Sequence, residues 1–241
     1  QVLQLSGIGD ATHLKSVGVQ HVVKDLPAVG KELQDHLITI VAHQMSEPLH
    51  TEHGNLVDVN MFVKDRKDDR YYLQMYNIMF QRSIPQFGVE PNTFGCESIL
   101  LTPDSRGSVM IRTNRHTDDP AINFNFLDKE RDLNVIIEGI RRIRKIIDNL
   151  PSGVKVREIF PGRDKQSDEE LAQCIRSVAF PIFHPAGTCK MTEYFDREKS
   201  VVDSRCRVWG VRKLRVADAS IMPLIVSGNT NAASLMIGDK C

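Results

Sequence analysis

One histidine and one asparagine near the end of the sequence, His184 and Asn231, have side chains that suit the oxidation of an alcohol. His184 lies in the segment FHPAGTCKM (residues 183–191), and Asn229 and Asn231 lie in the segment SGNTNAAS (residues 227–234). An imidazole titrates near neutral pH, so it can accept a hydroxyl proton and later return it. An amide can hold a substrate oxygen without acting as a competing base. No side chain accepts a hydride, so such a reaction also requires a cofactor.

A turn and a helix start in the same part of the sequence could hold a charged ligand. The segment LRVADASIMP (residues 214–223) predicts a short apolar strand and then a turn at residues 218–220. A loop rich in Gly and Asn follows and begins a last helix rich in Ala, Leu, Met and Ile. Small residues leave backbone N–H groups accessible at a helix start, which suits a negatively charged ligand. Asn229 or Asn231 could also cap this helix, and the two roles are compatible.

These segments carry a family resemblance. The motifs HPAGTCKM, LRVADASIMP and SGNTNAASLMIG resemble the C-terminal signature of the glucose–methanol–choline (GMC) family of FAD-dependent oxidoreductases. Near the start of the chain, LSGIG (residues 5–9) resembles the tail of a second family signature, and residues 25–36 resemble the segment that follows it. Four blocks in the same order over nearly the whole chain make the resemblance specific. Their wording is most similar to the arthropod glucose dehydrogenase-like branch of the family.

The resemblance implies a role for each candidate site residue. It places His184 against the flavin edge as the general base and makes Asn231 the second active-site residue. It brings Asp218 and Ala219 close to the FAD through the turn, and it puts Ala232 and Ala233 against the isoalloxazine ring. The start of the last helix would then stabilise the negative charge on the reduced flavin. Alanines that only pack a helix would look the same in the sequence.

The implied activity is FAD-dependent oxidation of a small-molecule alcohol or sugar hydroxyl. The hydride would pass to flavin N5 and the electrons to a quinone-like acceptor or oxygen. Three alternatives stay open: an oxidase that uses oxygen, a hydroxynitrile lyase of the same family, and a non-catalytic binding fragment. The last is considered because nothing in the sequence matches the dinucleotide fingerprint G-x-G-x-x-G.

The same absence predicts that the chain is the C-terminal part of a longer enzyme. We expect an α/β fold in which an antiparallel sheet belongs to an α+β substrate domain. Residues 1–38 would be part of the FAD-binding domain, residues 39–180 the substrate-binding domain, and residues 181–241 the C-terminal part of the FAD-binding domain with the active site.

Composition excludes some function classes. Lys plus Arg and Asp plus Glu balance at 31 each, so no net charge argues for nucleic acid or a membrane surface. No apolar run approaches the roughly 20 residues of a membrane span. The five cysteines are scattered without a Cys-x-x-Cys pair, so no metal site is expected, and their odd number leaves at least one thiol without an intrachain partner. The sequence starts at Gln1, so targeting cannot be read, although the resemblance slightly favours secretion.

Hydrophobic periodicity and capping residues predict the helices and strands that position the site. Residues 10–17 should form a helix with Asp10 as its N-cap. Apolar residues that recur every three or four positions predict a long helix over residues 128–150, and a capping box at residues 167–170 should begin another that ends near residue 178. Strands are expected at residues 19–24, 37–44, 71–80, 96–101, 108–112 and 121–126, the last three in an antiparallel sheet.

Other polar residues have simpler interpretations. His36 is expected to set the loop near the cofactor rather than to do chemistry, and Cys189 is expected to be a buried spacer. Members of the family commonly have Asn where this chain has Glu32, which leaves the hydrogen bonding of that loop open. His50 and His53 are expected in a solvated loop because Pro48 and Gly54 disfavour a helix there. The basic residues of the long helix are expected on its solvated face: Arg141, Arg142, Arg144 and Lys145.

Overall fold

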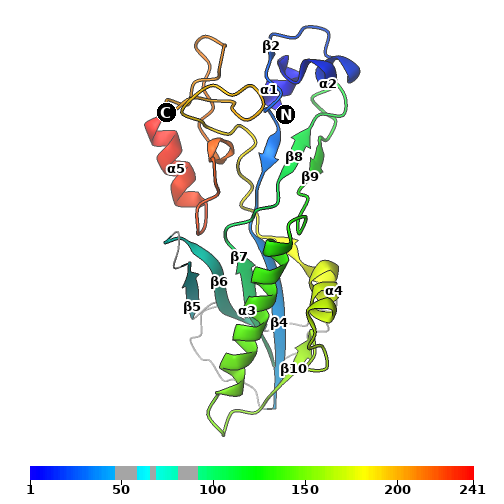
Figure 1. Cartoon of the computed structure of the whole chain (residues 1–241), viewed down its shortest axis with the longest axis vertical. Helices are drawn as coiled ribbons and strands as arrows, with labels where there is room; N and C mark the ends of the chain where they lie inside the picture. Colours follow the sequence, from blue (N-terminus) through cyan, green and yellow to red (C-terminus); the bar gives the residue numbers. More distant parts are fainter. Residues whose placement is uncertain (47–58, 66–68, 81–91) are drawn as a thin grey trace. The chain divides into compact units, whose positions relative to one another are not determined.

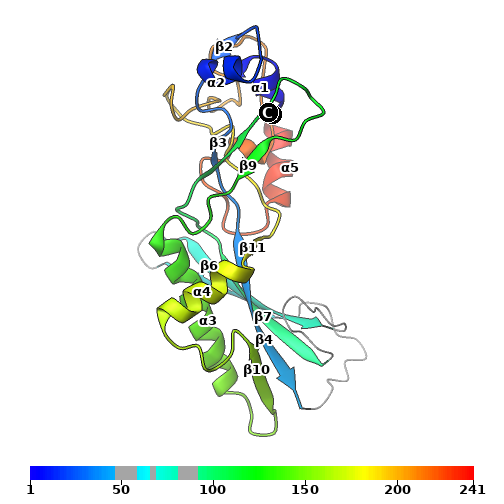
Figure 2. The same cartoon turned by 90° about the vertical axis from the view of Figure 1, so that its right-hand side faces the viewer.

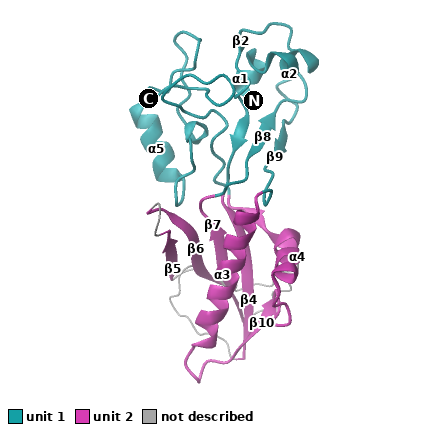
Figure 3. Cartoon of the chain, viewed as in Figure 1, with its two compact units in different colours: residues 1–35, 103–128, 183–241 teal, residues 36–102, 129–182 magenta. Residues whose placement is uncertain are grey.

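The computed structural model describes residues 1–46, 59–65, 69–80 and 92–241, which form two compact units (Figure 3). Unit 1 consists of Gln1–Asp35, Pro103–Asp128 and Phe183–Cys241, and unit 2 consists of His36–Thr102 and Lys129–Ile182. Both units combine helices with antiparallel strand pairs, so the chain has the expected mixed α/β fold. His50 and His53 lie outside the described residues.

Unit 2 is built on one antiparallel sheet of six strands, in the order β10-β4-β7-β6-β5 with β11 also paired to β4 (Figures 1 and 2). Its central pair, β4 and β7, runs in register from Leu37 opposite Leu100 to Gln44 opposite Thr93. The strands are β4 (Leu37–Met45), β5 (Asn60–Lys64), β6 (Tyr71–Phe80), β7 (Thr93–Leu100), β10 (Val156–Phe160) and β11 (Phe180–Pro181).

Helix α3 (Glu130–Asp148) packs against this sheet through the apolar stripe that the sequence predicts. Ile136, Ile140 and Ile143 are at most 2% exposed. Gly139 faces Ser98 of β7 so closely that an added Cβ would lie 1.9 Å from its Oγ. The absence of a side chain at this position therefore sets how near the helix lies to the sheet.

One basic residue of α3 is not on the solvated face, so the expectation for Arg144 is wrong. Its side chain is 7% exposed, and its Nη2 lies 2.8 Å from Oε1 of Glu158, which is fully buried on β10. The same guanidinium donates hydrogen bonds to the carbonyl oxygens of Gly162 and Lys165. Arg141, Arg142 and Lys145 are exposed as predicted. A buried guanidinium is satisfied here because a carboxylate and two carbonyl groups converge on it.

Helix α4 (Asp168–Val178) begins as the sequence predicts. Ser167 accepts a hydrogen bond from the backbone N–H of Glu170, and the Glu170 carboxylate accepts one from the N–H of Ser167, which completes the capping box. Leu171 and Ile175, one turn apart, are the buried residues of the helix. The chain then passes through β11 to the segment of His184.

Unit 1 contains short elements around two apolar clusters, one that includes Ile8 and Ile237 and a smaller one formed by Leu14, Val19 and Ile111. Helix α2 (Ala11–Ser16) is capped by the Asp10 carboxylate, which accepts from the N–H groups of Thr12 and His13. β3, β8 and β9 form an antiparallel sheet in that order, and β1 pairs with β2 in parallel. The elements are α1 (Val2–Leu5), β1 (Ile8–Gly9), β2 (Lys24–Asp25), β3 (Lys31–Leu33), β8 (Gly107–Met110), β9 (Ala121–Asn123), the 3-10 helix η2 (Ala219–Ile221) and α5 (Asn231–Lys240).

Several expectations about elements need correction. Within residues 19–24 only Lys24 joins a strand, and residues 214–217 contribute only an isolated bridge between Arg215 and Arg207. The expected substrate domain of residues 39–180 stays a prediction; unit 2 overlaps most of this range, while residues 103–128, with β8 and β9, belong to unit 1. Strands β5 and β10 were not foreseen, since their neighbours along the sheet, rather than their own periodicity, define them.

Candidate active site

Backbone hydrogen bonds on both sides hold the segment that carries His184. On one side, Gln34 and Ala186 exchange two bonds of 2.9 Å, N–H to carbonyl in each direction. On the other, the N–H groups of Gly187, Cys189 and Met191 donate to the carbonyl oxygens of consecutive residues in η2, Ala219, Ser220 and Ile221. These bonds therefore fix the turn that contains Asp218 and Ala219 against the segment that contains His184, although the two motifs are separate in the sequence.

Gly187 permits this close packing. It has φ of +93°, and an added Cβ would lie 2.4 Å from the carbonyl oxygen of Glu32. Glu32 itself has φ of +64°, a region where Asn is favoured over most other residues. Its carboxylate compensates by accepting from Nζ of Lys190 at 2.9 Å. The question that the sequence raised about this position is thus answered by an ion pair between Glu32 on β3 and Lys190 in the segment of His184.

His184 is half-buried, and its backbone is tied to Asp35. The N–H of His184 donates to Oδ1 of Asp35 at 2.9 Å, and Asp35 is 2% exposed. Burial lowers the pKa of the His184 imidazole below its usual value because the charged form loses solvation. The ring is therefore neutral near pH 7, which is the form that can accept a proton.

The imidazole lies beside an amide, that of Asn229. Nδ2 of Asn229 is 3.2 Å from Nε2 of His184. An amide nitrogen can only donate, so this contact needs an unprotonated Nε2 and leaves the ring proton on Nδ1. A substrate hydroxyl that displaced the amide would meet the lone pair of Nε2 directly.

Asn231 is the first residue of α5 and is exposed, as is Ala232, whereas Ala233 is half-buried against the core. Neither asparagine occupies the N-cap position, which is taken by Thr230, and Thr230 makes no side-chain capping bond. The first N–H groups of α5 therefore point from an uncapped helix start that is lined by small residues. Such groups suit a partly negative ligand atom.

Gln34 is a positioning residue that the sequence did not reveal. Its side chain is 2% exposed, accepts from the N–H of Ile225 at 3.1 Å and donates to the carbonyl oxygen of Pro223 at 3.3 Å. One side chain thus joins the segment of His184 to the chain that leads into α5. No local signal marks this glutamine, which lies in the polar segment KELQDH (residues 31–36), and its partners are about 190 residues away.

The structure also shows the surroundings of Cys189, Asp218 and His36. Burial raises the pKa of the Cys189 thiol, which is the opposite of what a nucleophile needs. Asp218 is exposed and its carboxylate accepts from the N–H of Ser220, so it caps η2. His36 is fully buried in unit 2, where its carbonyl oxygen accepts from the N–H of Ile182. Within the described ranges, no group of three or more His, Cys, Asp or Glu residues could hold a metal ion.

Comparisons with known proteins show which family this chain is similar to. The family model for GMC oxidoreductase matches residues 103–238. The oxygen-dependent choline dehydrogenase of Cronobacter sakazakii is 36% identical over an alignment of 274 residues, which covers 100% of this chain and 47% of that protein. The crystal structure of pyridoxine 4-oxidase from Mesorbium loti has a TM-score of 0.86 at 26% identity, covering 98% of this chain and 47% of that one. A fungal aryl-alcohol oxidase, at 20% identity and a TM-score of 0.81, shares the fold.

These matches identify the class of the protein as an oxidoreductase. More narrowly, the chain belongs to the GMC oxidoreductase family, as the four sequence blocks implied, and FAD is the cofactor of that family. The chain spans about half the length of the curated relatives it matches. The named relatives are a choline dehydrogenase and oxidases, so the similarity to glucose dehydrogenases stays a prediction.

Proposed function

We propose that this chain supplies the proton-transfer residues of an FAD-dependent enzyme that oxidises an alcohol or sugar hydroxyl. The observation that supports it best is the neutral, half-buried imidazole of His184 with an amide 3.2 Å from its Nε2. A general base needs both a lone pair in reach of the substrate and a pKa that leaves it unprotonated at working pH. His184 meets both requirements.

The residues present suit the flavin. The start of α5 offers uncapped N–H groups beside exposed Asn231 and Ala232, where no bulky side chain would hold the backbone away from a planar ring. Asp218 and Ala219 are fixed by the bonds between η2 and the segment of His184. When bound, the flavin supplies the hydride acceptor that no side chain can provide. We place the FAD contacts of this chain in unit 1 and assign the sheet of unit 2 to the substrate-binding domain.

The chain's own residues would handle the proton. Nε2 of His184 takes it from the substrate hydroxyl, and the Asp35 carboxylate keeps the backbone at His184 in place through its 2.9 Å bond. The amides of Asn229 and Asn231 hold the substrate oxygen, since an amide remains neutral while the imidazole gains charge. The imidazolium returns its proton to solvent or to the electron acceptor after the oxidised product forms.

The chemical class of the alcohol and the acceptor are the finer part of the proposal. An oxygen-dependent choline dehydrogenase, a pyridoxine oxidase and a fungal aryl-alcohol oxidase all resemble this chain, so oxygen is a second acceptor to weigh against a quinone. The hydroxynitrile lyase alternative shares the need for a base but transfers no hydride.

Anaerobic mixing of the full-length holoenzyme with a panel of primary alcohols and sugars tests the proposal. We expect the flavin absorbance to bleach with at least one of them, and peroxide yield with and without a quinone then separates the two acceptors. Cyanohydrin cleavage without bleaching would instead favour the lyase. A protein that binds no flavin and oxidises no alcohol would support the non-catalytic alternative and overturn the proposal.

A further inference from the structure

Helix α5, which places Asn231 and follows Asn229, has little burial to hold it. Ile237 is the one residue of α5 that is buried, at 9% exposure. Leu235 and Met236 are 69% and 53% exposed. A ten-residue helix with one buried side chain and no N-terminal capping bond gains little from packing. Packing alone therefore holds this helix, and the adjoining Asn229 beside His184, only weakly.

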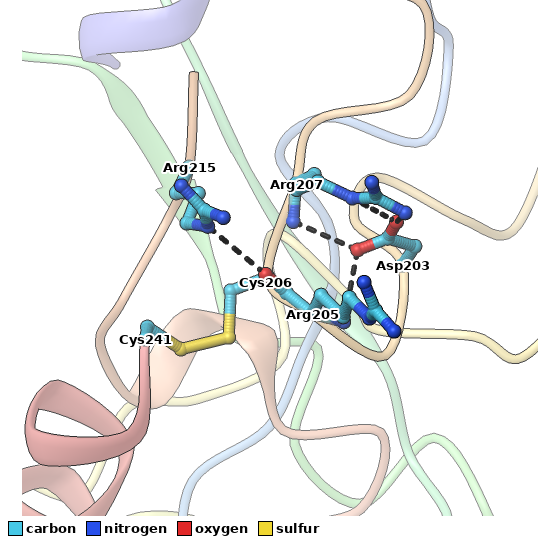
Figure 4. Close-up of a disulfide and its surroundings, with 6 residues drawn as sticks. All are labelled: Asp203, Arg205, Cys206, Arg207, Arg215 and Cys241. Atoms are coloured by element: carbon cyan, nitrogen blue, oxygen red, sulfur yellow. Dashed lines mark hydrogen bonds and ion pairs between the residues drawn. A yellow bond between two sulfur atoms is a disulfide. The ribbon is translucent and has the colours of Figure 1, made fainter. Parts of the chain in front are cut away.

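A disulfide joins the far end of this helix to the core of unit 1 (Figure 4). Cys241 directly follows α5 and pairs with Cys206, 35 residues earlier in the sequence. Their Cα atoms are 6.1 Å apart, within the range that disulfides occupy. The other three cysteines, Cys96, Cys174 and Cys189, are thiols.

The loop that carries Cys206 is a firm attachment point. Cys206 is 5% exposed and lies in the same core cluster as Ile237. The Asp203 carboxylate accepts from the backbone N–H groups of Arg205 and Arg207 and from the Arg207 guanidinium, as Figure 4 shows. The N–H of Cys206 donates to the carbonyl oxygen of Asp203 at 2.9 Å. One carboxylate therefore fixes the backbone on both sides of the half-cystine.

We propose that the Cys206–Cys241 disulfide is a positioning cross-link that holds α5, and with it Asn229 and Asn231, in place beside His184. The catalytic consequence depends on the proposed function, but the mechanical consequence does not. To form the bond, the two thiols lose two protons and two electrons to a small-molecule or protein disulfide, which is reduced to two thiols. Reduction reverses this exchange and leaves α5 held to the core by Ile237, its one buried residue, and by the partly buried Ala233.

The simpler alternative is that Cys206 is a small apolar residue of the core and Cys241 an accessible thiol. Peptide mapping of the full-length holoenzyme, secreted from a eukaryotic host and alkylated without reductant, separates the two. We expect one linked peptide pair that contains Cys206 and Cys241, with alkylated Cys96, Cys174 and Cys189. Alkylation of both Cys206 and Cys241 without reductant would overturn the proposal.

Amide hydrogen exchange measures the tether independently of activity. In Cys241→Ser we expect the amides of α5 to exchange roughly 30-fold faster or more, which is the lower end of what a disulfide supplies. Cys174→Ser, a partly buried thiol of α4, is the matched control and should leave α5 unchanged. Cys206→Ser should reproduce Cys241→Ser, and reductant should accelerate exchange in the wild type but not in either variant. Equal exchange of α5 in all four proteins would contradict the proposal.

Flavin reduction then tests the link to the site. At a temperature where every variant stays folded, we expect the reduction rate to fall roughly tenfold to a hundredfold in Cys241→Ser, because small misplacements of a positioning group cost this much. Reoxidation of reduced wild type with glutathione disulfide should restore the rate. A merely stabilising cross-link would lower the thermal midpoint and leave this rate unchanged, which would overturn the positioning role. Failure of the wild type itself to reduce flavin would count against the proposed function and not against the tether.

Discussion

Nδ2 of Asn229 lies 3.2 Å from Nε2 of His184, although the resemblance to the family had assigned the second site position to Asn231. Asn231 is two residues further on, at the first position of α5. The contact with Asn229 occupies the lone pair that a base would use, so a substrate oxygen must displace it. We therefore propose separable roles for the two asparagines: Asn229 is the partner of the His184 imidazole, and Asn231 contacts the substrate from the helix start.

Removal of the imidazole should lower the rate of the chemical step without unfolding the protein. We expect His184→Ala in the full-length holoenzyme to slow flavin reduction by roughly two to four orders of magnitude, the usual share of general base catalysis. Stopped-flow absorbance under anaerobic conditions measures the rate. His21→Ala is the control, because His21 is exposed. An unchanged rate in His184→Ala would remove this residue from the mechanism.

Replacement of each asparagine separates their two roles. We expect Asn231→Ala to give a smaller but clear loss in the rate of flavin reduction, because the substrate oxygen loses a donor that becomes more important in the transition state. Asn229→Ala should change the acid limb of the pH profile as well, since Nε2 of His184 loses its neighbour. For both variants, kcat and kcat/KM are measured as functions of pH. If Asn231→Ala lowered only thermal stability, its role would be confined to the helix.

The lowered pKa of His184 predicts activity in mildly acidic solution. Burial favours the neutral ring, so its pKa lies below the usual 6.5. The base therefore remains mostly unprotonated at pH 6.5. Below its pKa the protonated ring cannot accept a proton, so kcat/KM should drop about tenfold for each further pH unit. The profile of kcat/KM against pH in the free enzyme measures this. An acid limb centred well above pH 6.5 would contradict the prediction.

The sequence predicted best where local pattern decides. The apolar stripe of α3, the capping box at Ser167 and the N-cap Asp10 each depend on residues that are only a few positions apart in the sequence. All three were confirmed. Residues 19–23 have the β-branched residues of a strand, but they lie outside any strand, because propensity needs a partner to pair with.

Long-range contacts set what the sequence could not show about the site. The side chain of Gln34 joins residues 223–225 to the segment of His184, and no periodicity encodes a contact over that separation. The same holds for Arg144. Its position in the sequence does not distinguish it from its exposed basic neighbours, and only the fold brings Glu158 of β10 beside it. The family blocks were recognisable because each is contiguous, whereas the pairing of His184 with Asn229 depends on how two blocks fold together.

His43 predicts a stability that depends on pH. The ring is fully buried on β4, stacked on Phe94 with centroids 5.1 Å apart, and burial lowers its pKa to about 4, while the opposite Glu158 raises it in part. Between pH 6.5 and 4 the unfolded chain binds a proton here that the folded chain does not. The free energy of unfolding should therefore decrease as the pH is lowered from 6.5 to 4, by up to about 3 kcal/mol.

Denaturant unfolding at several pH values measures the effect of His43. In His43→Leu this part of the pH dependence should disappear, and His116→Leu, at an exposed histidine, should retain it. Identical pH dependences in wild type and His43→Leu would show that folding does not lower the pKa of His43, which would contradict the prediction.

Two arginines that are only two residues apart in α3, and therefore on different faces of the helix, provide an internal comparison of buried and exposed ion pairs. Arg144 is 7% exposed and is paired with Glu158, whereas Arg142 is 47% exposed and is paired with Glu138 at 2.6 Å. We expect Glu158→Ala to lower the free energy of unfolding by about 3–5 kcal/mol, because it leaves buried guanidinium charge without its carboxylate. Glu138→Ala should cost less than about 1 kcal/mol, since water screens that pair. Urea denaturation of both variants at pH 7 measures the difference, and equal losses would mean that solvent reaches the Arg144 guanidinium as freely as that of Arg142.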